Sequence, residues 1–539
     1  MITLQGKGVS AGIAMGPLVF FERSTFVVEK KLINDTKGEI ERFHAARRTA
    51  GDQLDELSQT MAEKIGKENA LLFEIHRMML EDTDYYEPIV KAIETLSVCA
   101  EYAVQETGRQ LAKDFAEMED VYMRERAADV DDVSKRVIAI LAGTQQTGTE
   151  GKEPVVLASN DFSPSETAQF NREKVLALVC QQGAANSHTA IFARTMGIPA
   201  IIGLGASLAP GLANKPVALD GETGTLYIDP TPEVREALKQ KQEQLVKDRQ
   251  SLEQFRGKPT LTKSGQKIKL FANIGSVTDV DAVLANDAEG IGLFRSEFLY
   301  LGREDYPGED IQYESYRKVV ERLGGKQVII RTLDIGADKQ VDYFELPKEE
   351  NPALGMRAIR ICLTRPQLFK TQLRAIYRAS AHGNAAIMFP MISDLEELRR
   401  SKAIAKQVRE ELSAEGIAFN PDTPIGIMIE TPASAVISDL LAKEADFFSI
   451  GTNDLTQYTL AVDRQNESIR EFCDVHHEAI LRLIRTTVEN AHKAGIWCGV
   501  CGMLGADPDL TQTFADMKMD ELSVEPSYIL KLRRRIAEL

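Results

Sequence analysis

The chain has 539 residues, too many for one ordinary domain, so about two to four domains are expected. Hydrophobic residues make up 43% and charged residues 27%, and the formal net charge of −17 without a basic stripe argues against a nucleic-acid partner. No run approaches the roughly 20 apolar residues of a membrane span, so no membrane insertion is expected. The negative charge favours a basic protein partner. The six scattered cysteines are typical of reduced thiols, which predicts a cytoplasmic location.

The amino-terminal segment predicts a strand that enters a domain. Its sequence, MITLQGKGVSAGIAMGPLVFF, is moderately apolar, but Gly and Pro interrupt it and no basic region precedes the apolar residues. A secretory signal peptide needs such a region. We therefore expect no signal peptide here.

Residues 35–141 have a helical pattern, from which about four long helices are expected. Apolar residues recur at spacings of three and four, and Pro88 is the only proline of this run. Short β-like runs and one short helix, residues 189–196, follow it. The pattern predicts a helical insert, residues 31–143, inside an α/β domain made of residues 1–30 and 144–230. The β-like runs are residues 154–159, 174–180, 199–203, 216–220 and 225–229.

The second half of the chain predicts a barrel. Residues 232–255 are charged and rich in glutamine, which is typical of a solvated linker helix, and we assign residues 231–257 to it. From residue 258 to residue 539, eight short apolar runs alternate with helix-compatible segments. This number and spacing predict a (β/α)₈ TIM-type barrel, with a doubly wound sheet as the alternative. The runs are residues 268–273, 290–294, 327–332, 386–391, 425–430, 446–450, 496–501 and 520–524.

Polar residues stand at the carboxyl ends of several predicted barrel strands, where the chemistry of such barrels is found. A lone arginine at such a position is more often a surface ion-pair residue than a ligand. Several polar residues at corresponding strand ends indicate a site instead. Two carboxylates with three arginines suit a divalent cation, magnesium above all, shared with an anionic substrate. The residues are Arg295, Arg331, Asp334, Glu430, Asn453, Asp454, Arg464 and Cys501.

Cys498 and Cys501 match the C-x-x-C spacing of a thiol redox motif. Such a motif has to open a helix, where the helix dipole lowers the thiol pKa. Here the two cysteines lie in an apolar run that follows a helix, so as strand residues they should point to opposite faces. A single thiol, Cys501, able to donate a proton from the strand end is the better interpretation.

His188 follows two good N-cap residues, Asn186 and Ser187, and opens a short amphipathic helix that Gly197 and Pro199 end. At a helix N-terminus the dipole disfavours imidazolium, so the ring stays neutral and nucleophilic. The same terminus would favour an attached phosphate. A lone histidine in a loop is usually an ordinary surface residue. In a chain with 7 histidines this position makes His188 a candidate nucleophile.

These motifs resemble Enzyme I of the phosphoenolpyruvate:sugar phosphotransferase system over nearly the whole chain. The resemblance implies that His188 takes the phosphoryl group of phosphoenolpyruvate and that Cys501 protonates the enolate to give pyruvate. It also implies that Glu430 and Asp454 bind Mg²⁺, and that Arg295, Arg331, Asn453, Asp454 and Arg464 bind phosphoenolpyruvate. The motifs are SHTAIFARTMGIPAIIG, EGIGLFRSEFLY, RTLDIGADK, ENPALGMRAIR, MFPMI, ETPAS, DFFSIGTNDLTQYTLAVDR, HRMMLED and ERAADVDDVSKRV.

The resemblance further implies the role of each domain. The α/β domain would be a swivelling phosphohistidine domain, because donor site and histidine lie in different domains. The helical insert would bind the phosphocarrier protein HPr, with His76, Met78 and Met79 in the docking surface or, for the methionines, in the helix core. HPr would carry the phosphoryl group to sugar uptake. A homodimer through the barrel is also implied.

Three departures from the family pattern stand out. Ala185 and Asn186 replace a usual Arg-Thr pair before the Ser-His motif, which removes an arginine able to hold the histidyl phosphate. Met503 replaces a usual glutamate after the cysteine motif. The chain ends at Leu539, sooner than many relatives, so we expect any contribution of a longer tail to the dimer to be lost or replaced.

Three other functions fit the sequence less well. Phosphoenolpyruvate synthase and pyruvate phosphate dikinase share the histidine and the barrel, but they need a large nucleotide-binding domain before the histidine domain. A non-catalytic regulatory relative would have no use for the arginine and carboxylate residues of the barrel. A thiol oxidoreductase built on Cys498 and Cys501 would leave the arginines unexplained.

Overall fold

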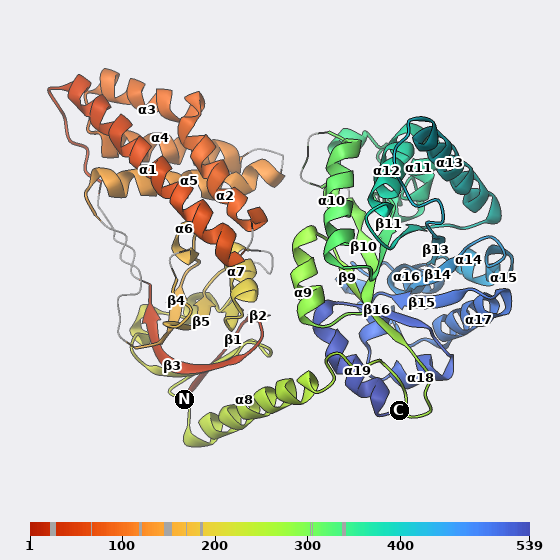
Figure 1. The fold of residues 1–539 in the computed structure, drawn as a ribbon. Helices are drawn as coiled ribbons and strands as arrows, with labels where there is room; N and C mark the ends of the chain where they lie inside the picture. Colours follow the sequence, from red (N-terminus) through yellow and green to blue (C-terminus); the bar gives the residue numbers. More distant parts are fainter. Residues whose placement is uncertain are drawn as a thin grey trace. The chain divides into compact units, whose positions relative to one another are not determined.

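The computed structural model of the chain forms two compact units, Met1–Lys247 and Asp248–Leu539 (Figure 1). None of its described helices is long and apolar enough to cross a membrane. The structure describes residues 1–21, 28–65, 67–117, 121–144, 153–168, 170–183, 187–301, 303, 305–336 and 341–539.

The described part of the first unit contains one mixed eight-stranded sheet in the order β1-β8-β7-β3-β4-β5-β6-β2. The expected single strand at the amino terminus is three strands instead. Gly12, at φ 137°, turns the chain between β2 and β3 in a conformation that favours glycine. The five β-like runs after the helical region all form strands, as predicted. The strands are β1 (Ile2–Gln5), β2 (Lys7–Ser10), β3 (Ile13–Phe20), β4 (Val155–Ser159), β5 (Val175–Cys180), β6 (Ala200–Ile202), β7 (Pro216–Asp220) and β8 (Thr225–Ile228).

The helical region has five helices among its described residues, so the prediction of four is wrong. The Asp82 side chain accepts a hydrogen bond from the backbone N–H of Asp84 and starts a new helix there. Ser97, in the left-handed conformation at φ 46°, ends that helix. The helices are α1 (Thr36–Ile65), α2 (Lys67–Glu81), α3 (Thr83–Leu96), α4 (Ala100–Ala116) and α5 (Val121–Leu141).

One hydrophobic cluster joins these helices to the sheet. Phe43 and Ile89 of the helices belong to the same cluster as Leu178 of β5. Phe162 and Phe170, before β5, meet edge to face with ring centroids 5.2 Å apart. The helices and the sheet therefore share one core. Two short helices, α6 (Pro164–Thr167) and α7 (His188–Met196), lie between the later strands in the chain.

The predicted linker helix is α8, Pro232–Glu253. Near its start, Leu238 packs with Ile13 and Ala218 of the sheet. Lys241 pairs there with Asp220 at 2.7 Å. The helix is thus packed against the first unit at its beginning, while most of its later residues are exposed.

The second unit contains a closed barrel of eight parallel strands among its described residues. All eight predicted apolar runs form its strands, in chain order, which confirms the (β/α)₈ prediction and excludes the doubly wound sheet. The strands are β9 (Lys269–Ile274), β10 (Gly290–Arg295), β11 (Gln327–Arg331), β12 (Ala385–Phe389), β13 (Ile425–Ile429), β14 (Phe447–Gly451), β15 (Trp497–Cys501) and β16 (Glu521–Val524).

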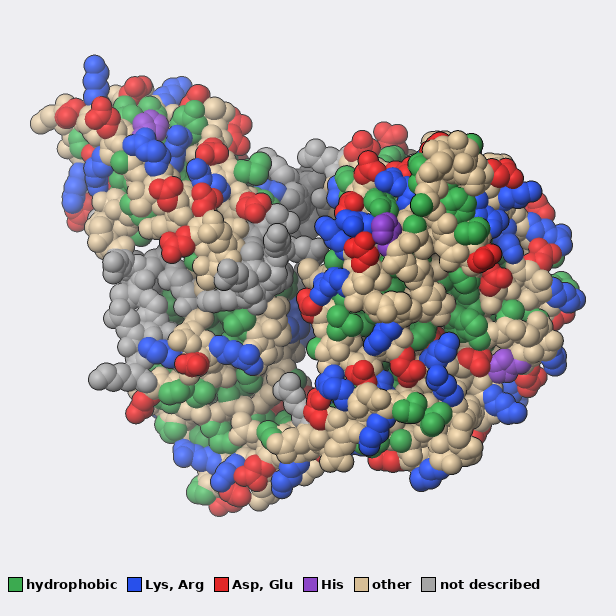
Figure 2. All heavy atoms as spheres, viewed as in Figure 1, with side chains coloured by type: hydrophobic (Ala, Val, Ile, Leu, Met, Phe, Trp, Pro, Cys, Tyr) green, Lys and Arg blue, Asp and Glu red, His purple; other side chains and the backbone are tan. Residues whose placement is uncertain are grey.

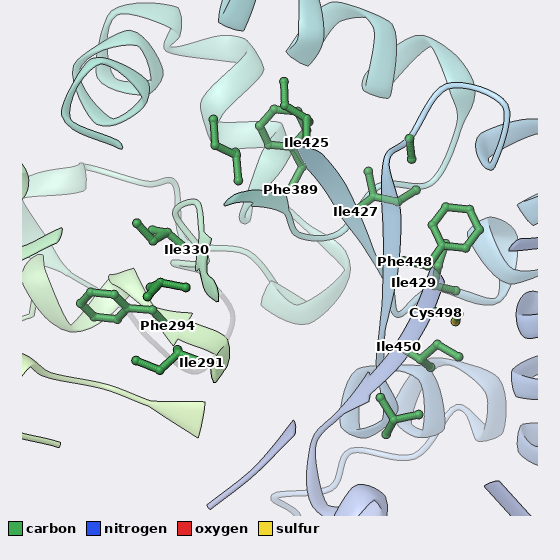
Figure 3. Packing of buried hydrophobic residues seen from close by; sticks show 14 of the residues in the cluster. Ile291, Phe294, Ile330, Phe389, Ile425, Ile427, Ile429, Phe448, Ile450 and Cys498 are labelled. Atoms are coloured by element: carbon green, nitrogen blue, oxygen red, sulfur yellow. The ribbon is translucent and has the colours of Figure 1, made fainter. Parts of the chain in front are cut away.

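Side chains alternate along the barrel strands between two cores. Phe294, Ile427 and Phe448 point outward into the layer between strands and helices (Figure 3). Leu293 and Phe447, their neighbours in the chain, belong to the separate interior cluster. The surrounding helices are α9 (Val280–Ala285), α10 (Glu309–Arg322), α11 (Ile359–Thr364), α12 (Pro366–Ser380), α13 (Leu395–Ala414), α14 (Pro432–Val436), α15 (Ser438–Leu441), α16 (Thr452–Leu460), α17 (Glu478–Ala494), α18 (Thr511–Asp516) and α19 (Ile529–Ala537).

Charged side chains of both signs are mixed over the face of the barrel unit seen in Figure 2. The ion pairs that Arg331 and Arg357 form with carboxylates are buried instead, at one end of the barrel.

Candidate active site

The carboxyl ends of the barrel strands carry the residues that the sequence predicts as a site. Arg295 and Arg331 are the last residues of β10 and β11 and lie opposite each other in the strand register. Glu430 directly follows β13, and Cys501 ends β15. Asp454 lies in the first turn of α16, directly after β14. Because all the strands are parallel, these residues meet at one mouth of the barrel.

Arg331 is held at this mouth by two carboxylates. Its Nη2 donates to Glu297 Oε1 at 2.6 Å, and its Nη1 lies 3.0 Å from Asp334 Oδ2. Burial alone would lower the pKa of Arg331, but Glu297 and Asp334 more than offset this and raise the pKa. The guanidinium is therefore permanently charged and fixed in orientation.

Arg357 is a second buried arginine of the mouth, and the sequence did not predict it. Its Nη2 donates to Asp334 Oδ1 at 2.9 Å, and its Nη1 donates to Tyr458 Oη at 2.9 Å and to Asp454 Oδ1 at 3.4 Å. It lies in the irregular segment between β11 and α11, so it has no strand-end position to reveal it. The only signal in the sequence is its place in the motif ENPALGMRAIR.

The backbone around Arg357 is unusual. A Cβ on Gly336 would lie 2.5 Å from the Cβ of Arg357, so only glycine allows the two segments to pack. Ala358 has φ 50° and ψ −123°, and its N–H donates to Ile335 O at 2.9 Å. This conformation is costly for a residue with a Cβ, and tertiary contacts maintain it.

Glu430 is a buried carboxylate with an altered pKa. Its Oε1 accepts a hydrogen bond from the backbone N–H of Met391 at 2.6 Å. Burial, followed by repulsion from Asp454 and Asp334, raises its pKa to about 8. A Cβ on Gly451 would lie 2.7 Å from Glu430 Oε2, so that glycine makes room for the carboxylate.

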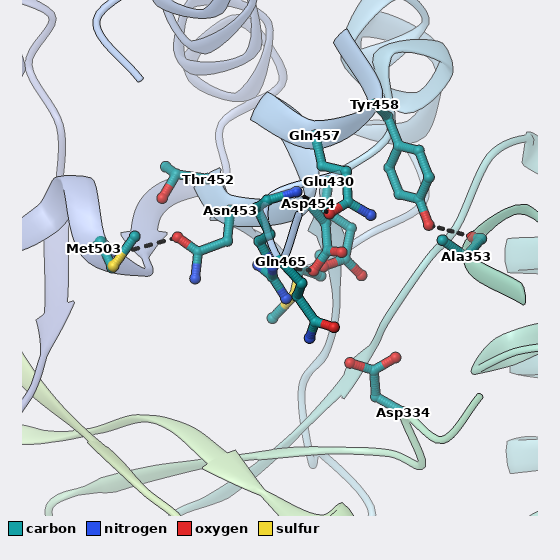
Figure 4. Close-up of polar contacts among 12 residues, drawn as sticks. Asp334, Ala353, Glu430, Thr452, Asn453, Asp454, Gln457, Tyr458, Gln465 and Met503 are labelled. Carbon is teal, nitrogen blue, oxygen red and sulfur yellow. Dashed lines mark hydrogen bonds and ion pairs between the residues drawn. The ribbon is translucent and has the colours of Figure 1, made fainter. Parts of the chain in front are cut away.

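Helix α16, which begins directly after β14, and the loop that follows it complete the mouth (Figure 4). Arg464 Nη1 is 4.0 Å from Asp454 Oδ2. Asn453 Oδ1 accepts a hydrogen bond from the backbone N–H of Met503 at 3.4 Å. Tyr458 Oη donates to Ala353 O at 2.5 Å and so joins α16 to the segment that carries Arg357.

Glu430 and Asp454 offer the hard oxygen ligands that magnesium prefers. Their mutual repulsion, which raises the Glu430 pKa, is the electrostatic condition that a bound cation would relieve. No group of three or more His, Cys, Asp and Glu side chains among the described residues is arranged to hold a metal by itself. The chemistry of these two carboxylates therefore fits a magnesium ion.

Cys501 lies just inside the mouth, with only 2% of its surface exposed. Its thiol donates to Ile450 O at 3.6 Å. Burial raises its pKa to about 12, so the group is a thiol, not a thiolate, near neutral pH. Cys498 lies in the outer core instead, on the opposite face of β15, as predicted. This orientation excludes a dithiol pair and with it the thiol oxidoreductase alternative.

His188 opens α7, at the predicted position. The Ser187 hydroxyl accepts a hydrogen bond from the N–H of Ala190 at 3.3 Å and caps the helix. Thr189 Oγ1 donates to Asp161 Oδ1 at 2.9 Å and anchors this first turn. The His188 side chain, and the departures at Ala185 and Asn186, lie outside the described residues.

The three predicted docking residues differ in exposure. His76 is fully buried, with Nε2 at 3.2 Å from Asp129 Oδ1 and Nδ1 at 3.8 Å from Asp132 Oδ2. In this conformation it cannot touch a partner, because the ring joins α2 to α5. Met79 is half-buried against the core, and Met78 is 69% exposed.

Three family models match the chain. "PEP-utilising enzyme, N-terminal" covers residues 5–126, and "PEP-utilising enzyme, mobile domain" covers residues 151–224. "PEP-utilising enzyme, PEP-binding domain" covers residues 249–539, which include the whole barrel.

Curated relatives align from end to end. The phosphoenolpyruvate-protein phosphotransferase of Bacillus subtilis (strain 168) is 41% identical over 540 residues, covering 100% of this chain and 95% of that protein. The protein of that name from Geobacillus stearothermophilus is 42% identical over 538 residues, covering 100% of this chain and 93% of that protein. A solved structure described as an NMR solution structure of Enzyme I is 31% identical, covers 45% of this chain and 99% of its own, and has a TM-score of 0.40. Because curated relatives of this identity align with the whole chain, the chain belongs to the phosphoenolpyruvate-protein phosphotransferase family, Enzyme I.

Proposed function

We propose that this chain transfers the phosphoryl group of phosphoenolpyruvate to His188, releases pyruvate, and passes the group to the phosphocarrier protein HPr. This would be the first step of sugar uptake by the phosphotransferase system. The observation that carries the proposal is the set of buried, oriented arginines at the barrel mouth, next to two carboxylates and a protonated thiol.

Phosphoenolpyruvate would bind to the arginines of the mouth. Arg295, Arg331 and Arg464 can pair with its phosphate and carboxylate oxygens in the bidentate manner of guanidinium groups. Arg357 joins this set on the evidence of its position beside Asp454. Asn453 would add an amide N–H, because its carbonyl oxygen is already used by Met503.

Glu430 and Asp454 would hold Mg²⁺ together with the substrate. When bound, the cation would supply positive charge that stabilises the transferring phosphoryl group. The arginines orient the same group, and the neutral imidazole of His188 attacks phosphorus in line with the departing enolate oxygen. At the start of α7 the helix dipole favours that neutral ring.

Cys501 would protonate the enolate. Its raised pKa keeps the proton on sulfur until a strong base, the C3 carbon of the enolate, lies beside it. Loss of this proton gives pyruvate and leaves a thiolate inside the barrel.

The partners follow from the family. HPr would dock on the helical region, where Met78 is exposed and can contact it directly. His76 would act there only by holding α2 against α5. Two copies of the chain would pair through the barrel, where Val436 and Leu440 are exposed apolar residues.

Incubation with phosphate-labelled phosphoenolpyruvate and Mg²⁺ tests the assignment of His188. The wild-type protein and the control His44→Gln should acquire acid-labile label, and His188→Gln should acquire none. His44 is a suitable control because it lies on α1 of the same unit. Label that persists in His188→Gln, or that requires ATP, would overturn the proposal.

A further inference from the structure

Glu521 is a buried carboxyl group inside the barrel with no role in the site described above. It is the first residue of β16, and 1% of its surface is exposed. Its Oε1 has no hydrogen-bond partner among the described residues. Such a group is costly to bury in an interior that Leu293, Met388 and Phe447 otherwise make apolar.

Two glycines make the space for this carboxyl group. A Cβ on Gly499 of β15 would lie 1.9 Å from Glu521 Oε2, and a Cβ on Gly292 of β10 would lie 2.5 Å from Oε1. Both positions point into the barrel. Burial raises the pKa of Glu521 well above its ordinary value, so the group is a neutral acid that retains a proton.

The strand register places this acid one layer from the thiol of Cys501. Glu521 lies opposite Gly499, and Ser523 lies opposite Cys501. Two residues along a strand span about 6.6 Å, which one intervening hydroxyl group can bridge. Ser523 provides that hydroxyl: a Cβ on Gly292 would lie 2.4 Å from its Oγ, so it stands in the same space as the Glu521 carboxyl.

The hydroxyl of Ser523 is held by Asn273 on the neighbouring strand β9. Its Oγ donates to Asn273 Oδ1 at 2.7 Å, and Asn273 Nδ2 donates to Ser523 O at 3.2 Å. The lone pairs of Ser523 Oγ therefore remain to accept the proton of Glu521. By the strand register, Ser523 stands beside Cys501 and one layer from Glu521.

Solvent approaches the Glu521 end of β16. An open pocket of about 830 Å³ lies at the amino-terminal ends of the strands and is lined by Lys267, Trp497 and Asp520. Asp520 directly precedes Glu521, and its Oδ2 lies 2.8 Å from His492 Nε2. The pocket thus reaches the amino-terminal end of β16, the strand that begins with Glu521.

We propose that Glu521 returns a proton to Cys501 after each turnover, by way of the Ser523 hydroxyl. The inference rests on the proposed role of Cys501. The S–H bond of Cys501 breaks as its proton passes to C3 of the enolate, whose C=C electron pair forms the new C–H bond. The Ser523 hydroxyl then turns from Asn273 Oδ1 to the thiolate and gives it a proton, and Ser523 Oγ takes the carboxyl proton of Glu521. The carboxylate recovers a proton from water at the pocket.

The test compares two exchange rates in one reaction. Enzyme with Mg²⁺, unlabelled phosphoenolpyruvate and carbon-labelled pyruvate, in deuterium oxide, moves label into phosphoenolpyruvate without any acceptor protein. This carbon exchange only shuttles one proton between sulfur and C3. Deuterium enters the pyruvate methyl group only when the Cys501 proton also exchanges with solvent.

Glu521→Gln keeps the size of the side chain and has no acidic proton. We expect carbon exchange within about twofold of wild type and deuterium incorporation lowered about tenfold or more. Ser523→Ala, which lacks the bridging hydroxyl, should do the same. Met388→Leu, a volume-conserving change in the same interior cluster, should alter neither rate.

The outcomes separate this inference from the proposed function. If Glu521→Gln and Ser523→Ala keep the wild-type ratio of deuterium to carbon exchange, the thiol exchanges directly through the mouth and the relay is wrong. If carbon exchange is absent in the wild-type protein, or unchanged in Cys501→Ala, the proposed function itself fails. If Glu521→Gln lowers both rates together with its melting temperature, Glu521 is structural and the relay is wrong.

Discussion

The barrel carries two kinds of arginine–carboxylate cluster, one at its mouth and one on its outer helices. On the outside, Arg374 and Arg378 both pair with Glu309 at 2.6 Å, across α12 and α10. At the mouth, Arg331 and Arg357 share Asp334, and both side chains are buried. The outer pairs are partly solvated, so they are expected to contribute little to stability. The mouth cluster is buried and keeps its charges in fixed orientation. Such an arrangement is well suited to binding a charged ligand, whereas buried ion pairs are weak evidence for a contribution to fold stability.

The largest effect is expected for Arg331→Met. The change leaves the fully buried Glu297 without the guanidinium that neutralises it, which should destabilise the fold by about 3–5 kcal/mol. Adding Glu297→Gln should restore most of that stability but none of the phosphoenolpyruvate-dependent phosphorylation. Denaturant unfolding and phosphorylation assays measure both. A double variant as unstable as the single one would contradict this account.

Arg374→Ala is the matched control from the outer cluster. It removes contacts with Glu309, Glu411 and Glu415, one ionic partner more than the two that Arg331→Met removes. We expect a loss of less than about 1 kcal/mol and unchanged phosphorylation. A loss as large as that of Arg331→Met would mean that burial does not distinguish the two clusters.

A smaller effect, with a defined pH dependence, is expected for Glu430→Gln. The folded protein keeps the Glu430 proton up to about pH 8, whereas the unfolded chain loses it near the ordinary value of 4.5. Without metal, the wild type should therefore lose stability between about pH 5 and pH 8, and the variant should not.

At pH 8 in a chelator, Glu430→Gln should exceed the wild type by on the order of 2 kcal/mol. Mg²⁺ should then stabilise the wild type alone and support phosphorylation only there. Melting temperatures of the two proteins, measured at pH 5 and at pH 8 with and without Mg²⁺, test this. A variant less stable than the wild type at pH 8 without metal would refute it.

The smallest effect is expected at an exposed pair, His476 with Asp507, at 2.6 Å. The hydrogen bond to Asp507 raises the His476 pKa. This stabilisation is complete below the unfolded value of 6.5 and is lost as the pH rises through the folded pKa. Because the imidazole is largely exposed, His476→Asn should cost no more than about 0.5 kcal/mol at pH 6, and less in high salt. Equal stabilities at pH 6 in low salt would show that the pair contributes nothing.

The sequence predicted the regular parts of the fold well. All eight barrel strands and the short helix at His188 are marked by apolar runs or by capping residues, and these signals are local. The helical region was predicted less well. The break at Asp82 depends on a side-chain cap between two segments with the same apolar spacing, so periodicity alone did not separate them.

The sequence predicted the site residues that lie at strand ends and missed a residue that lies in an irregular segment. Arg295, Arg331 and Cys501 close apolar runs, so their positions were visible. Arg357 lies in an irregular segment, and only the folded chain brings it to Asp334 and Asp454. The burial of His76 was equally hidden from the sequence: the resemblance places it in the docking surface, whereas its ring is buried beside Asp129 and Asp132.

The strained backbone at Ala358 bears on both the stability of the protein and the orientation of Arg357. A glycine there would adopt φ 50° and ψ −123° without the steric cost that alanine pays. The same change would free the segment that holds Arg357 in place. Ala358→Gly would thus remove the backbone strain but let Arg357 move, which would weaken the substrate binding proposed for it. At position 358, a low-strain backbone and a fixed position of Arg357 therefore favour different residues.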